Sequence, residues 1–224
     1  MNDDQQDVQQ KLFIPALITL VILILWPVMM TLSELSGTID EQLAWLSSDA
    51  LLYRLNFLVA SLIAPPLVVV MIGLSRYTPA VKQTPLLDQF GMIMLAPYML
   101  LVTIAYSAQY IMVPAALAAG DVQSARQWFF ENPQGFSYFF NQLGYTFFAL
   151  SALAIGFKFL FGRGLVKWIG IVLWSSGMLS LIAFAGLALQ NETINSATFI
   201  SGLLMLPFCL LVMLWFRKEL KPVP

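Results

Sequence analysis

Six long apolar runs, separated by short polar segments, dominate the pattern of this sequence. They cover about residues 12–32, 50–74, 89–116, 136–157, 168–189 and 197–216. An α-helix needs about 20 apolar residues to cross the hydrocarbon core of a bilayer. The pattern therefore predicts an all-α fold, a polytopic bundle of six transmembrane helices between a polar N-terminal tail (residues 1–11) and a basic C-terminal tail (residues 217–224).

The charges in the polar segments predict the orientation of the bundle. The turn between the fourth and fifth runs carries three cations and no acidic residue, which is typical of a cytoplasmic loop. The segments on that side hold nine cations: Lys11, Arg76, Lys82, Lys158, Arg163, Lys167, Arg217, Lys218 and Lys221. The opposite side holds only Arg54 and Arg126. This bias predicts that both termini are cytoplasmic.

Two short helices are expected in the extracytoplasmic loops. Thr38 and Glu41 have the spacing of a capping box, in which each side chain accepts a hydrogen bond from the backbone of the other residue. Asp121 is a candidate N-cap ahead of an aromatic cluster at residues 128–130. Because such aromatic residues favour the headgroup region, both helices are predicted to lie along the membrane interface. An ordinary solvated turn is the alternative for the first of them.

The composition excludes several classes of function. Hydrophobic residues make up 59% of the 224 residues and charged residues 10%, whereas a soluble domain carries about 25% charged residues. The net charge of −1 argues against a nucleic-acid partner. Histidine, the commonest metal ligand and general base, is absent, and the one cysteine, Cys209, cannot form an intrachain disulfide. No cofactor and no metal site is expected.

Polar residues gather at the predicted outer ends of the second, third and fourth helices. Arginine and amides at membrane depth are costly unless paired or hydrated, so they tend to face the interior of a bundle. Eight residues are expected to line an outward-facing cavity covered by the two loops: Arg54, Asn56, Tyr106, Gln109, Tyr110, Asn141, Gln142 and Tyr145. Arg54 would supply a positive charge suited to an anionic headgroup or a carboxylate. Alternatively, Arg54 extends to the surface and pairs with Glu34 or Asp49, while the amides bond between helices.

No catalytic residue is expected at membrane depth. The fifth helix carries Ser175, Ser176 and Ser180, but a nucleophilic serine needs a base beside it, and none accompanies them. With Gly177, these serines are expected to form a close-packing face. The predicted spans contain no Asp or Glu away from their ends, which disfavours proton- or sodium-coupled transport.

Prolines fall within the second, third and sixth predicted helices. Pro65 and Pro66 lack the backbone N–H that a helix needs, so a kink is expected there. Together with Pro97 and Pro207, they are either hinges of a moving protein or static packing features.

Two segments resemble a known family. Tyr53-Arg54-Leu55-Asn56, at the head of the second helix, and the turn from Gly162 to Gly170 (GRGLVKWIG) are similar in layout to a bacterial family of six-span integral membrane proteins known only as a domain of unknown function. The similarity covers roughly residues 12–190, and Val166 stands where the family commonly has proline. The resemblance implies a bacterial inner-membrane protein, and it transfers no catalytic residue.

Three classes of function follow from these observations. The favoured one is non-enzymatic binding of a lipid, a small amphiphile or a partner helix in the outward-facing cavity. The second is a transporter or channel component, and the third is a membrane enzyme, disfavoured because acid–base groups at depth are nearly absent. The expected partners are the lipid bilayer, the bound amphiphile, and either another membrane protein or a second copy of this chain; no nucleic acid is expected.

Overall fold

The computed structural model describes residues 3–77 and 84–219, with side chains for residues 12–77 and 84–217. Every regular element among these residues is a helix. In chain order they are α1 (Asp3–Leu32), α2 (Ile39–Leu46), α3 (Leu51–Ser61), α4 (Ala64–Arg76), α5 (Pro85–Tyr110), α6 (Met112–Ala118), α7 (Val122–Trp128), α8 (Phe136–Gly156), the 3-10 helix η1 (Phe157–Phe161), α9 (Leu165–Ala188), α10 (Glu192–Asn195), α11 (Ala197–Leu203) and α12 (Met205–Glu219). The side chains of Lys11, Lys82, Lys218 and Lys221 lie outside the described residues.

Six helical spans in the described part of the chain are long and apolar enough to cross a membrane, which confirms the predicted number. They are Leu12–Leu32, Leu51–Arg76, Pro85–Ala118, Phe136–Phe161, Leu165–Ala188 and Glu192–Arg217, numbered one to six below. The protein is therefore a multi-pass membrane protein. α1 begins at Asp3, within the stretch expected to form a polar tail. Acidic residues favour the first turn of a helix, so this stretch extends the apolar helix.

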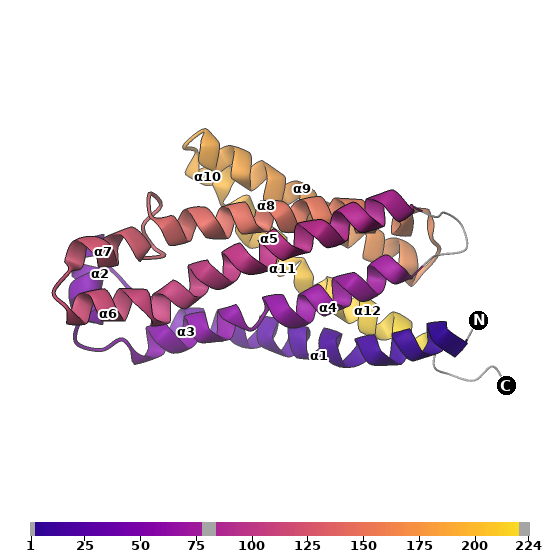
Figure 1. Cartoon of the computed structure of the whole chain (residues 1–224), viewed down its shortest axis with the longest axis horizontal. Coiled ribbons are helices and arrows are strands. Elements are labelled where there is room, and N and C mark those ends of the chain that lie inside the picture. Colours follow the sequence, from indigo (N-terminus) through magenta and orange to yellow (C-terminus); the bar gives the residue numbers. More distant parts are fainter. Residues whose placement is uncertain (1–2, 78–83, 220–224) are drawn as a thin grey trace.

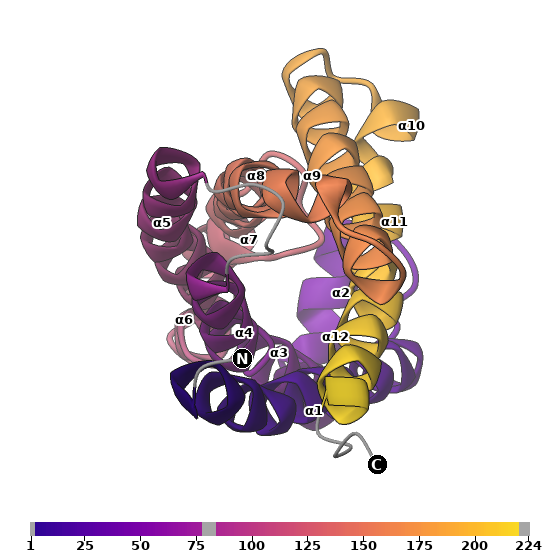
Figure 2. The same ribbon diagram turned by 90° about the vertical axis from the view of Figure 1, so that its right-hand side faces the viewer.

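The six spans, which lie side by side in Figure 1, form a closed ring in which each span packs on the next one in sequence (Figure 2). α1 packs on α3 and α4, which pack on α5; α5 packs on α8, and α8 on α9. α9 packs on α11 and α12, and α12 returns to α1. Figure 2 shows the ring from the end at which α1 begins and α12 ends, which we call the terminal end. The opposite end, which carries α2, α6, α7 and α10, is the α2 end.

Three spans have a break whose first helix ends four residues before a proline. The breaks separate α3 from α4 ahead of Pro65, α5 from α6 ahead of Pro114, and α11 from α12 ahead of Pro207. In each case the first helix ends at the residue whose carbonyl would have accepted a hydrogen bond from the missing proline N–H. The break expected at Pro65 and Pro66 is thus present, whereas α5 continues through Pro97.

A buried ion pair joins three spans at the terminal end. Lys158 of η1, expected in a solvated turn, has a side chain that is only 1% exposed. Its Nζ lies 2.9 Å from Asp88 Oδ1 of α5 and donates to Ser75 O of α4 at 2.7 Å. Four aromatic rings pack in the same region, from α12, η1 and the residue after α4: Tyr77, Phe159, Trp215 and Phe216. The ring is therefore filled at the terminal end.

The helices expected in the loops at the α2 end are present with their predicted caps. Thr38 N–H donates to Glu41 Oε2 at 2.7 Å, and Glu41 N–H donates to Thr38 Oγ1 at 3.4 Å, which completes the capping box of α2. Asp121 caps α7, since its Oδ1 accepts a hydrogen bond from Ser124 N–H at 3.0 Å. Local sequence thus sets where both helices begin.

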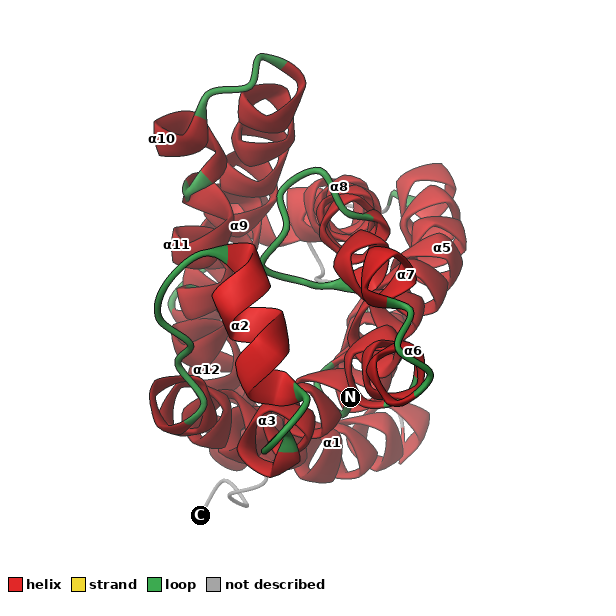
Figure 3. Cartoon of the chain, turned by 90° about the vertical axis from the view of Figure 1, so that its left-hand side faces the viewer, coloured by secondary structure: helices red, strands yellow, loops and turns green. Residues whose placement is uncertain are grey.

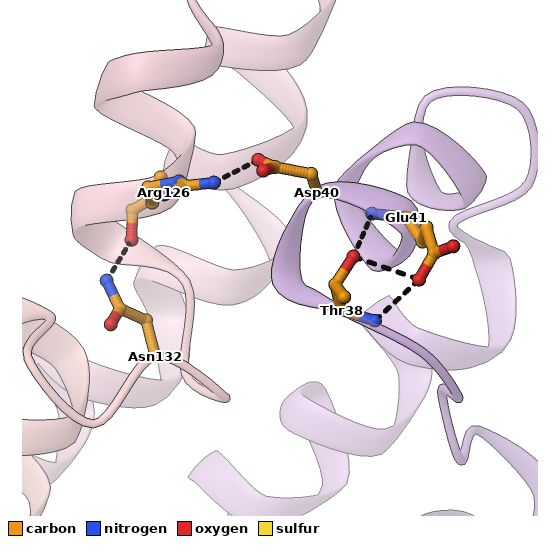
Figure 4. A network of polar contacts seen from close by, with 5 residues as sticks. All are labelled: Thr38, Asp40, Glu41, Arg126 and Asn132. Carbon is orange, nitrogen blue, oxygen red and sulfur yellow. Dashed lines mark hydrogen bonds and ion pairs between the residues drawn. The ribbon is translucent and has the colours of Figure 1, made fainter.

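α2 and α7 contact each other at the α2 end. Arg126 Nη2 is ion-paired with Asp40 Oδ1, and Asn132 Nδ2 donates to Arg126 O at 2.9 Å, which ties the following loop to α7 (Figure 4). Leu43 and Leu46 of α2 are buried against the rest of the fold. Figure 3 shows α2 lying across this end of the ring.

Breaking the buried ion pair is expected to destabilise the protein. In Lys158→Met, the Asp88 carboxylate loses its cationic partner in a largely buried position, and such losses cost about 3–5 kcal/mol. The free energy of unfolding, measured by denaturant titration of the purified protein in detergent micelles, should fall by about that amount.

The control for this prediction is Lys167→Met, which changes an exposed lysine near the same turn and should leave the unfolding free energy within about 0.5 kcal/mol of wild type. The double variant Lys158→Met/Asp88→Leu removes both charges and should recover most of the loss. Equal stability of the Lys158→Met and Lys167→Met proteins would contradict a structural role for the pair.

Candidate functional site

A cavity of about 220 Å³ lies between spans one, three, four and six, toward the α2 end; we call it the amide-lined cavity. One wall is polar and comes mainly from α8, with contributions from α5 and α10: Tyr106, Tyr138, Asn141, Gln142, Tyr145 and Asn195. The other wall is apolar and comes from α1 and from α11 and α12: Leu23, Trp26, Met30, Phe199, Leu203 and Leu206. None of the described residues that line it is charged.

α8 and α5 place the first part of the polar wall. Asn141, Gln142 and Tyr145 lie within one helical turn of α8, so their side chains leave the helix close to one face. Tyr106 reaches the same space from α5, and its hydroxyl lies 3.4 Å from the Tyr145 hydroxyl. Of the residues predicted to form a site, these four are brought together by the structure.

α10 supplies a residue that the sequence analysis had assigned to a loop. The close approach of α9 makes this possible, because a Cβ on Gly186 would lie 2.5 Å from Asn195 N. Asn195 Nδ2 donates to the Tyr138 hydroxyl, which fixes the amide against α8. In the sequence, the one sign of this role is that Asn195 is a polar residue just before the apolar run at residues 197–216.

Two amide oxygens in the cavity have no hydrogen-bond partner within the described protein. They are Asn141 Oδ1 and Asn195 Oδ1, on residues that are only 5% and 7% exposed. The neighbouring Gln142 Oε1, by contrast, accepts from Thr198 Oγ1 at 2.8 Å. Buried acceptors without donors are uncommon and costly, so these two oxygens are suited to a ligand or water that donates hydrogen bonds.

A second hollow, of about 350 Å³, lies beside the first at the α2 end; we call it the acidic recess. Its walls come from the end of α1 and the residues after it, from α3, and from the loop after α7: Met30, Glu34, Tyr53, Asn56, Phe57 and Glu131. Asn56 Oδ1 is buried and has no partner in the described protein. Met30 lines both hollows.

The Glu131 carboxyl holds its proton more tightly than an ordinary glutamic acid does. Part of its side chain is accessible, but the protein that surrounds the recess raises its pKa above the ordinary value, because burial disfavours the charged form. A positively charged neighbour would stabilise the ionised form of this carboxyl. None of the described residues that line the recess carries a positive charge.

Gln109 lies outside both hollows, and both the oxygen and the nitrogen of its side-chain amide form hydrogen bonds within the protein. Its Oε1 accepts from the Tyr53 hydroxyl at 2.7 Å and from Phe130 N–H at 3.0 Å. Its Nε2 is placed to donate to acceptors in α5, α7 and α8: Ala105 O at 2.9 Å, Trp128 O at 2.8 Å and Ser137 Oγ at 2.8 Å. Gln109 therefore joins spans two, three and four to the α7 segment, and no part of its amide is left for a ligand.

The other predicted residues are separated from the cavity. Arg54 lies on the exposed face of α3 and lines neither hollow, and Tyr110 is half-buried at the end of α5 and lines neither. Asn56 lines the recess instead of the amide-lined cavity. Span one and span six therefore take the place that span two was expected to occupy around the cavity.

The serines of α9 and the single cysteine were the remaining residues that could have carried chemistry. In the described structure, Ser176, Ser180 and Cys209 are buried in the packing between helices. Ser176 Oγ and Ser180 Oγ lie 2.9 and 2.7 Å from Ser201 Oγ of α11, so the predicted packing face includes hydrogen bonds between α9 and α11. Ser175 is exposed, and Cys209 is buried. Within the described part of the chain, no group of three or more Cys, Asp or Glu side chains is placed to hold a metal ion.

Comparison with known protein families, curated proteins and solved structures identifies no relative of this chain. No family model, no curated protein and no solved structure matches this chain. The resemblance to the bacterial six-span family stays a prediction.

Replacing Gln109 should weaken the fold. In Gln109→Leu, the Tyr53 hydroxyl and the Phe130 N–H lose their acceptor, and each buried group left unpaired costs about 1–3 kcal/mol. The unfolding free energy of the purified protein should fall by at least about 2 kcal/mol. Gln127→Leu, at an exposed position on α7, is the control and should behave as wild type; equal effects of the two changes would argue against this role.

Proposed function

We propose that this protein lies in the bacterial inner membrane with both termini in the cytoplasm and the α2 end outside. The described cations support this orientation, because Arg76, Lys158 and Arg163 belong to the terminal end whereas Arg126 belongs to the α2 end. In this orientation, α2 and α7 lie near the outer membrane surface, where Trp45 and Trp128 suit the headgroup region.

The protein binds, in this proposal, an amphiphile whose head donates hydrogen bonds. The observation that carries the proposal is the pair of unpartnered oxygens, Asn141 Oδ1 and Asn195 Oδ1, on two residues that line one cavity together with many apolar side chains. The oxygens accept from hydroxyl, amide or ammonium groups. The apolar wall favours a hydrocarbon chain, because burying apolar surface beside apolar surface needs no polar partner.

The position of the cavity supports access from the bilayer. α12 packs on α1, but α11 packs on α9, and the cavity separates α11 from α1. Phe199 and Leu203 of α11 are partly exposed while they line the cavity. A lipid chain can therefore reach it between spans one and six, whereas aromatic rings fill the ring at the terminal end.

A transporter of the same amphiphile is the second candidate. It is favoured by the break between α11 and α12, because Leu203 and Leu206 on either side of the break both line the cavity. Interrupted helices at a binding site are common in transporters. Movement of a fluorescent amphiphile between the leaflets of proteoliposomes would favour transport, and binding without such movement would favour the first candidate.

The orientation can be tested with single cysteines. In spheroplasts, an impermeant maleimide should modify Gln123→Cys, which lies on α7, and should modify Lys167→Cys only after the membrane is permeabilised. Both positions are exposed, and the native Cys209 is buried, so the unmodified protein is the control. Labelling of Lys167→Cys before permeabilisation would reverse the proposed topology.

Filling the cavity should abolish binding. A Cβ on Gly202 would meet no atom within 4 Å, and this residue lines the cavity. The side chain of Gly202→Phe should therefore occupy the ligand space without displacing the protein. Electron spin resonance of a spin-labelled single-chain alcohol should show a motionally restricted component with wild-type protein in bilayers, and this component should fall about tenfold with the variant, equivalent to about 1.4 kcal/mol.

Two variants serve as controls for this test. Gly202→Ala adds little volume and should retain the restricted component. Leu210→Phe adds an aromatic ring on the exposed face of α12 and should also retain it. If Gly202→Phe binds the probe as wild type does, the cavity is not the binding site.

A further inference from the structure

A charged head on a chain in the amide-lined cavity would lie in the neighbouring acidic recess, whereas an uncharged head would stay at the cavity amides. Met30 lines both hollows. The two also share an aromatic wall, because Phe130 of the cavity packs against Phe57 of the recess with ring centroids 5.0 Å apart. A chain lying along the cavity can thus extend its head past Met30 into the recess.

The recess offers acceptors of hydrogen bonds without matching donors. Asn56 is 6% exposed, and its Oδ1 has no partner in the described protein. Glu34 and Glu131 add carboxylates, which have acceptors and no donor when they are ionised. The described lining contains no lysine and no arginine. A group that only donates is therefore the complementary ligand, and an ammonium has donors and no acceptor.

Aromatic rings stand beside these acceptors. Tyr53 and Phe57 both line the recess, and their ring centroids are 4.8 Å apart with the planes inclined at 56°. The faces of aromatic rings attract cations through their quadrupole. Both rings are almost completely buried, so it is the two carboxylates that favour an ammonium over a hydroxyl, which carries no charge, and over a carboxylate, which they would repel.

We infer that the acidic recess binds the ammonium group of a cationic or zwitterionic amphiphile whose chain lies in the amide-lined cavity. The inference rests on the proposed function for the chain, but it concerns a separate set of residues. It reverses the charge preference expected from Arg54, which lies on the outer face of α3, whereas Tyr53, Asn56 and Phe57 face the recess from the same helix.

The test compares three spin-labelled single-chain probes that differ only in the head: an alcohol, a primary ammonium and a carboxylate. Restricted fractions are measured with the full-length protein in bilayers of phosphatidylcholine. Wild type should bind the ammonium probe about tenfold more tightly than the alcohol, because hydrogen bonds to charged groups contribute more than neutral ones. The carboxylate should bind more weakly than the alcohol.

The variants separate the recess from the cavity. The double variant Glu34→Gln/Glu131→Gln should reduce the ammonium preference to about onefold while leaving the alcohol bound as in wild type. Glu34 and Glu131 are both exposed, so this change should not prevent folding; the unfolding free energy of each variant verifies it. Glu192→Gln, an exposed acidic residue of α10 outside the recess, is the matched control and should keep the preference.

The outcomes distinguish the two proposals. Equal binding of ammonium and alcohol by wild type, or a preference that survives Glu34→Gln/Glu131→Gln, overturns the ammonium site. If the alcohol still binds and is displaced by Gly202→Phe, the proposed function stands alone. If no probe shows restriction that depends on Gly202, the proposed function fails.

A competition arm identifies the source of the ammonium. Methylammonium, which has no chain, is added against the ammonium probe. If methylammonium displaces the probe from wild type but not from Glu34→Gln/Glu131→Gln, the ammonium site is supported. The site then accepts a water-soluble amine as well as a lipid headgroup. The absence of displacement, with the probe preference intact, supports the site and assigns it to the lipid headgroup.

Discussion

Hydrocarbon offers no hydrogen-bond partner, so each polar group that a span turns inward must find its partner within the protein, in water or in a ligand. Most of the inward polar groups here are satisfied by other spans. Lys158 bonds across to α4 and α5, Ser201 bonds to the two serines of α9, and Gln109 bonds to α3, α7 and α8. The asparagine oxygens of the cavity and the recess depart from this rule, as does the buried Ser151 Oγ of α8. The asparagines line the two hollows, whereas Ser151 lines neither.

The sign of the charge around the two hollows follows from which face of α3 turns inward. Tyr53, Asn56 and Phe57 lie three and four residues apart, so they share one face, and all three are buried. Arg54 follows Tyr53 by one residue, which rotates its side chain by about 100° around the helix, away from that face. The carboxylates come from segments outside the regular spans, Glu34 after α1 and Glu131 after α7. The amide-lined cavity is therefore neutral and the recess is acidic, while Arg54 lies on the exposed face of α3.

The sequence predicted the architecture better than it predicted the site, for a physical reason. Apolar length fixes the number of spans in lipid, and local hydrogen bonds fix caps such as those at Thr38 and Asp121, so both could be predicted without tertiary contacts. A cavity depends on which spans are neighbours around the ring. Asn141 and Tyr106 could be grouped from the sequence because spans three and four are consecutive and α5 packs on α8. Asn195 could not be predicted, because its place depends on the sixth span packing back against α8 and α9.

The break ahead of Pro207 lies beside the amide-lined cavity. The missing N–H of Pro207 leaves the carbonyl of Leu203 without a helical donor, and α11 ends at that residue. On the terminal side of the break, α12 packs on α1 and closes the ring; on the other side, α11 follows α9 instead. The cavity toward the α2 end thus lies beside a point where the sixth span lacks a backbone donor, because Leu203 and Leu206 on either side of the break both line it.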